Sequence, residues 1–114
     1  ADWARNNAFP FERCDPLANI LEVFVLFGSL ETKVDALMAL LELGTSHNRW
    51  YVERKFLGHA SATMDETLAR RMAVEFRASG QDVCDSIAHI ERSISVSRSA
   101  LHPILQQALG DICR

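Results

Sequence analysis

The sequence predicts an all-α domain, a bundle of five or six helices, and three observations support that fold class. Apolar residues recur at helical spacing along most of the chain, and candidate caps and glycines separate the apolar runs. The 114 residues are 48% apolar and 24% charged, an ordinary balance for one globular domain. The stretch 94–97 alternates like a strand, but it has no second strand to pair with and is assigned to a helix.

The stretch from Asp15 to Gly44 carries the strongest signal, and it predicts a central helical hairpin. Asp15 suits a helix N-cap, and Pro16 suits the first helical position. We expect Gly28 to end this helix in the left-handed conformation, Ser29 to cap the next, and Gly44 to close it. The stripe expected to face the core in the first helix comprises Leu17, Ile20, Leu21, Phe24 and Phe27.

The remaining segments are assigned in order along the chain. Residues 1–14 are expected to form an extended aromatic arm, and residues 15–114 a single helical bundle domain. A third helix should begin near residues 46–48 and end at Gly58, and a capping box at Thr63 should open a fourth that runs to about Ser79. Asp82 should cap the longest helix, which reaches residue 101, and Pro103 should begin a last short one. The residues expected to be buried include Leu37, Phe76 and Ile90.

Charge and cysteine content restrict the function classes. The net charge of −3 argues against a general nucleic-acid binder, and no apolar run is long enough for a membrane span. Cys14, Cys84 and Cys113 are odd in number and far apart, so we expect reduced thiols in a cytoplasmic protein rather than a disulfide framework. The absence of an initiator Met and of a secretory signal suggests a fragment of a longer intracellular protein.

Catalytic and ligand-binding patterns are not recognisable in the sequence. The four histidines lack metal-ligand spacing, no serine lies in a G-x-S-x-G motif, and no glycine-rich loop precedes a helix. We therefore expect no enzyme, no metal, no cofactor and no small-molecule substrate. A bacterial helical effector or phosphotransfer domain is a third hypothesis, although neither His59 nor His102 is followed by the expected Lys and Gly.

A basic and aromatic cluster supports an alternative function. The aromatic and basic side chains of residues 49–55 could stack on RNA, which would make the chain a small RNA-binding helical domain. A solvated helix face with one buried Trp is the favoured interpretation. The candidate RNA contacts are Arg49, Trp50, Tyr51, Arg54 and Lys55.

Part of the chain resembles a known family. The segments Leu26-Phe27-Gly28-Ser29-Leu30 and Lys55-Phe56-Leu57-Gly58, with the leucines of the second helix between them, resemble the helical dimerisation region of Smaug-type translational regulators and their CCHC zinc-knuckle relatives. The resemblance covers about a third of the chain. It implies an all-helical, non-catalytic module that homodimerises within an mRNA-regulating protein.

The hairpin carries more apolar residues than one buried stripe requires, and this surplus leads to the main functional hypothesis. A second apolar face on a small domain usually marks an interface. We expect a protein–protein interaction module, forming a homodimer, within a post-transcriptional regulator or scaffold protein; RNA would be reached through the parent protein, and no membrane is involved. The residues expected to line the interface are Val23, Leu26, Ala36, Leu40 and Leu43.

Overall fold

The computed structural model describes residues 15–113, and over this range it confirms the all-α class, with six α-helices and no strand. The expected arm, residues 1–14, lies outside the described residues, as does Arg114. The elements are α3 (Pro16–Phe27), α4 (Leu30–Ser46), α5 (Trp50–His59), α6 (Glu66–Ser79), α7 (Gln81–Ile94), a 3₁₀ turn η1 (Arg98–Ala100) and α8 (Pro103–Ile112).

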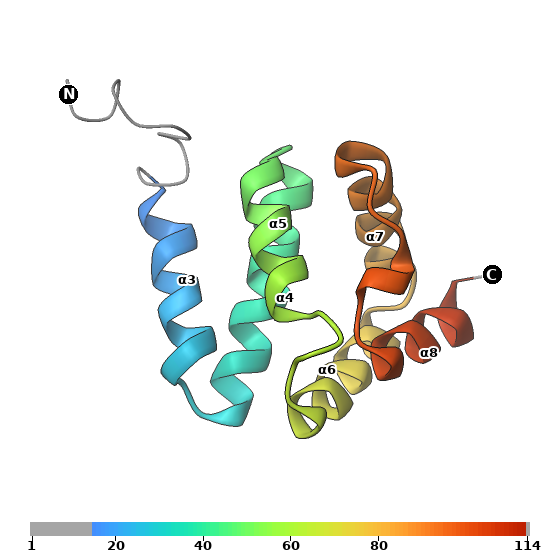
Figure 1. Cartoon of the computed structure of the whole chain (residues 1–114), viewed down its shortest axis with the longest axis horizontal. Coiled ribbons are helices and arrows are strands. Elements are labelled where there is room, and N and C mark those ends of the chain that lie inside the picture. Colours follow the sequence, from blue (N-terminus) through green and yellow to red (C-terminus); the bar gives the residue numbers. More distant parts are fainter. Residues whose placement is uncertain (1–14, 114) are drawn as a thin grey trace.

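Helix α4 is the centre of the bundle, and it contacts α3, α5, α6 and α7. Helix α3 stands at one edge, against α4 and α5, whereas α8 lies at the other end and packs on α6 (Figure 1). The predicted hairpin therefore forms, but its central position is wrong. Only its second helix is enclosed by the rest of the chain.

The caps of the hairpin follow the sequence. Asp15 accepts a hydrogen bond from the Ala18 N–H at 3.1 Å, and Ser29 accepts one from the Thr32 N–H at 3.3 Å, as predicted. Gly28, however, has φ −76° and ψ 171°, so the predicted left-handed end of α3 is wrong. The chain leaves α3 in an extended conformation and enters α4 directly.

Three other predicted boundaries shift. Gly44 lies inside α4, which continues to Ser46, and Gly58 lies inside α5. Helix α6 is capped by Asp65 rather than Thr63, because the Asp65 carboxylate accepts a hydrogen bond from the Leu68 N–H at 3.1 Å.

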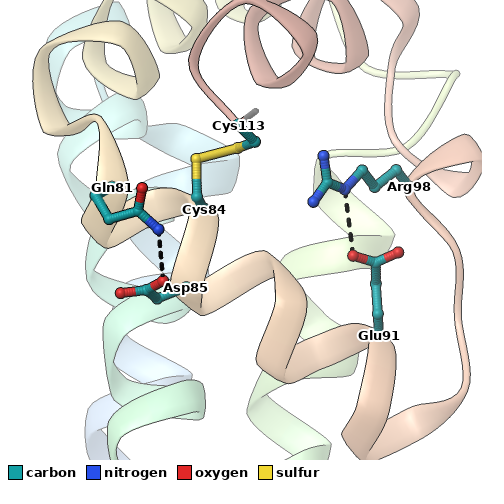
Figure 2. Close-up of a disulfide and its surroundings, with 6 residues drawn as sticks. All are labelled: Gln81, Cys84, Asp85, Glu91, Arg98 and Cys113. Atoms are coloured by element: carbon teal, nitrogen blue, oxygen red, sulfur yellow. Dashed lines mark hydrogen bonds and ion pairs between the residues drawn. A yellow bond between two sulfur atoms is a disulfide. The ribbon is translucent and has the colours of Figure 1, made fainter.

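The predicted longest helix is shorter than expected. It begins after Gly80, whose φ of 57° favours glycine, and it ends at Ile94 because Ser95 is left-handed, with φ 55°. The chain then runs back along α7, held by an ion pair of 3.2 Å between Arg98 and Glu91 (Figure 2). Leu101 is buried as expected, although it lies beyond the helix.

The core lies between α4 and the helices around it. Leu37, Phe76 and Ile90 are each at most 2% exposed, so their predicted burial is confirmed. The largest fully buried side chains come from α4, α5, α6, α7 and α8 and from Leu101 before α8. Helix α3 contributes only two fully buried side chains, Ala18 and Val25.

A disulfide joins Cys84 in α7 to Cys113 just after α8, with 5.5 Å between the two Cα atoms (Figure 2). The expectation of reduced thiols is therefore wrong for these two residues. Their separation of 29 positions hid the pairing, because only the packing of α8 on α6 brings Cys113 to the first turn of α7. Cys14 lies outside the described residues.

Replacing Gly44 with Ala should lower the free energy of unfolding by about 1–3 kcal/mol, although Ala normally stabilises a helix interior. A Cβ at Gly44 would lie 2.9 Å from Cγ of Glu53 and 3.0 Å from its backbone N. Gly58 has no atom within 4 Å of such a Cβ, so Gly58→Ala should be neutral or stabilise by up to about 1 kcal/mol. Urea unfolding measures both; equal stabilisation by the two variants would contradict the close packing of α4 on α5.

Reduction of the disulfide should lower the melting temperature by roughly 10–15 °C. The bond restricts the unfolded chain, which raises the free energy of unfolding by about 2–4 kcal/mol. Calorimetry with and without reductant measures the shift. Cys84→Ser should melt at the lower temperature in both conditions. Cys14→Ser is the control and should keep the full response to reductant. A wild type that melts identically in both conditions would show that the link does not form.

Candidate interaction surface

The outward face of α3, formed by Leu17, Ile20, Val23, Phe24, Leu26 and Phe27, is the main apolar surface of the described chain. Phe27 is 81% exposed, and the other five side chains are between 46% and 55% exposed. Asn19 is the only polar side chain among the exposed residues of the helix, and Glu22 is its only charged residue. Helix α3 therefore lacks the polar side that a helix at the edge of a bundle normally turns to water.

The predicted core stripe of α3 is thus on the wrong side of the helix. Leu17, Ile20, Phe24 and Phe27 are exposed, and Leu21 is half-buried. The side that faces the bundle carries small residues, and its fully buried members are Ala18 and Val25.

Two carboxylates determine which side of α3 faces the bundle. Asp15 lies 2.8 Å from the guanidinium of Arg49 and accepts a hydrogen bond of 3.1 Å from the Tyr51 hydroxyl. Glu22 lies 2.7 Å from Nζ of Lys55 and 2.8 Å from Nε2 of His59. These partners all belong to α5 or its N-cap, so the acids point inward and the larger apolar side chains point outward.

The contacts of the two acids lower their pKa values. Burial raises the pKa of Asp15, but hydrogen bonds from the Ala18 N–H and Tyr51, with the charge of Arg49, together bring it below the ordinary 3.8. Burial likewise raises the pKa of Glu22, and Lys55 and His59 outweigh it, so the pKa lies below the ordinary 4.5. Both groups favour the attachment of α3 in their ionised form.

The predicted interface residues separate into two groups. Val23 and Leu26 are exposed on α3, and Leu43 is half-buried. Ala36 and Leu40 are 3% and 0% exposed, so their predicted place on an outward face is wrong. The reason is the position of α4, whose second apolar side meets the surrounding helices instead of solvent.

The predicted RNA contacts lie together on α5 and at its N-cap, but they are engaged within the chain. Arg49 and Lys55 form the ion pairs with the acids of α3. The guanidinium of Arg54 lies 5.3 Å from the ring centroid of Trp50, whose ring meets that of Tyr51 edge-on at 5.8 Å. Phosphate binding by Arg49 or Lys55 would have to compete with these contacts.

Glu53 is a buried acid, 0% exposed, that the sequence pattern does not predict. Its Oε1 lies 2.8 Å from Nδ1 of His89, and Nε2 of His89 lies 2.7 Å from Oδ1 of Asn48. Among the described residues, none donates a hydrogen bond of ordinary geometry to the Glu53 carboxylate. Both imidazole nitrogens face groups of the chain, which makes this a link between α5 and α7. Its sequence signal, one acid beside Val52, is too common to be distinctive.

An acidic cavity of about 600 Å³ opens between α4, α6 and α7. Its walls carry five carboxylates, those of Asp35, Glu42, Glu75, Asp82 and Asp85. Within residues 15–113, however, no three His, Cys, Asp or Glu side chains are grouped so that they could hold a metal ion. None of the described helices combines the length and apolar character needed to cross a membrane.

Acid should loosen α3 through Asp15 and Glu22. Because their folded pKa values lie below 3.8 and 4.5, the stability they contribute is present above these values and is lost as the pH falls below them. Urea unfolding from pH 7 to pH 3 should show this loss, with a smaller decline in Glu22→Gln. Glu66→Gln, at a side chain 66% exposed on α6, should decline like the wild type. Identical pH profiles for all three proteins would contradict the role of Glu22.

No protein-family model matches the chain, and no curated protein or solved structure is significantly similar to it.

Proposed function

We propose that this chain is a non-catalytic protein–protein interaction module that binds its partner through the outward face of α3. The observation that carries the proposal is that α3 is apolar on both sides. A helix of this composition is normally buried all round, yet α3 lies at the edge of the bundle with six large apolar side chains exposed.

The size of this face suits a protein partner. At the exposures of its side chains, it offers on the order of 600–700 Å² of mostly apolar surface, near the roughly 800 Å² per partner of a standard interface. Within residues 15–113, the other exposed large apolar side chains are Leu30 at the start of α4, 38% exposed, and Val74 on α6, which needs no partner as an isolated side chain.

The charge around the face favours a protein over a membrane or a nucleic acid. Residues 16–27 contain no basic side chain, and Arg49 and Lys55 beside them are engaged by Asp15 and Glu22. Anionic lipid headgroups and phosphates would therefore meet no basic side chain on the helix that carries this face.

The setting we propose is a post-transcriptional regulator or a scaffold protein. The resemblance to the dimerisation region of Smaug-type regulators supports it, since Leu26 and Phe27 of the resembling segment belong to the exposed face. The expected cytoplasmic location rested on unpaired thiols. The Cys84–Cys113 bond removes that support, because such bonds persist mainly in oxidising compartments.

Two measurements on the full chain test the proposal. An anilinonaphthalene sulfonate dye reports open apolar surface, and light scattering reports the mass in solution. If the docking face is free, the monomer should bind the dye; if a second molecule covers it, light scattering should show an associated species. The double variant Phe24→Glu with Phe27→Glu should lose the dye binding or the association, whichever the wild type shows. Val74→Glu, on α6, should change neither dye binding nor mass.

A wild type that is monomeric and binds no dye would contradict the proposal, because other residues of the chain would then cover α3. RNA retention that falls steeply with salt and is lost in Arg54→Ala would favour the alternative on α5.

A further inference from the structure

We infer that the partner of the outward face of α3 is a second copy of this chain, with the two α3 helices packed antiparallel across a two-fold axis. The inference rests on the proposed function and names the partner of that same surface. In a two-fold interface the same patch of both copies meets, so the patch must be complementary to itself in shape and charge.

The composition of the face meets this requirement. Its six exposed side chains are uncharged, and Glu22, the only charged residue of α3, is engaged by Lys55 and His59. Two copies can therefore meet without burying an unpaired charge, which would cost several kcal/mol. A partner of another kind would need an uncharged apolar strip that matches this face in length. A second copy of the chain carries such a strip.

The antiparallel orientation follows from the order of side chains along α3. Reversal about the middle of Pro16–Phe27 places Ile20 opposite Val23 of the other copy and Leu17 opposite Leu26. It also places Phe24 opposite Asn19 and Phe27 opposite Pro16, so each aromatic ring meets a smaller residue. A parallel pair would instead oppose each ring to its own copy.

Electrostatics favour the same orientation. In an antiparallel pair the positive end of each helix macrodipole lies beside the negative end of the other, which is favourable. In a parallel pair ends of the same charge lie together.

The area is sufficient for a reversible dimer. Both copies together would bury on the order of 1,200–1,400 Å², the lower part of the range for specific interfaces. We therefore expect a dimer that dissociates on dilution.

Light scattering of the full chain across a dilution series tests the inference. The wild type should approach twice the monomer mass at high concentration, and Ile20→Glu should raise the dissociation constant by roughly 100-fold or more. Ile20 is 52% exposed, so this variant should keep its helical spectrum and melting temperature. Val74→Glu, 56% exposed on α6, is the matched control and should dimerise like the wild type.

A charge-pair variant tests the orientation. Ile20→Lys combined with Val23→Glu places opposite charges across an antiparallel interface twice, so it should dimerise more strongly than either single variant. In a parallel pair the same changes oppose like charges, and the double variant would stay monomeric. Restored dimerisation supports the inference, and a monomeric double variant beside a dimeric wild type would overturn the orientation.

The failure of this inference can be told apart from failure of the proposed function. A wild-type monomer that binds the apolar dye would exclude the second copy and leave α3 as a docking face for another protein. A monomer that binds no dye would contradict both. A dimer that persists in Ile20→Glu would place the contact between copies elsewhere on the chain.

Discussion

The rotation of α3 about its own axis depends on the ion pairs that fasten it to α5. Asp15 and Glu22 lie on the same side of α3, and their partners stand at the N-cap and along one side of α5. Turning these acids to water would leave Arg49 and Lys55 without their partners. The surface of the molecule follows from this constraint, because six large apolar side chains are then left outside.

The remainder of the bundle is held in a different way. Helix α4 is enclosed, and Leu37 and Leu40 on it are fully buried. At the far end, the disulfide ties α8 to α7. Helix α3 has neither kind of support, since its buried side chains are only Ala18 and Val25 and it depends on polar contacts that weaken in acid. The helix that offers the docking face is thus the α-helix of residues 15–113 with the fewest buried side chains.

The positions of the helices and the N-caps of the hairpin were predictable because they depend on neighbouring residues. Asp15 and Ser29 cap their helices as their sequence context indicates, and the core positions Leu37, Phe76 and Ile90 follow from helical spacing. The end of α7 was not predictable, because the left-handed turn at Ser95 has no glycine or proline to mark it.

The candidate site could be predicted only in part. The surplus of apolar residues on the hairpin was visible. A helix that is apolar on nearly every side, however, shows no alternation of apolar and polar residues that would identify the side facing the core. The inner face is marked by Glu22, whose partners lie 33 and 37 positions away, so no local pattern identifies it. The disulfide and the Glu53–His89 contact were missed for the same reason, since each joins distant segments.

Methyl NMR of the wild-type chain on dilution tests the central claim most directly, because it reports which apolar side chains change surroundings. Ile20 and Val23 lie on the exposed face, whereas Leu37 is in the core. The account predicts that the Ile20 and Val23 methyl signals shift as the protein is diluted while those of Leu37 stay constant. Unchanged signals at Ile20 and Val23, with shifts confined to another surface such as Val74, would contradict it.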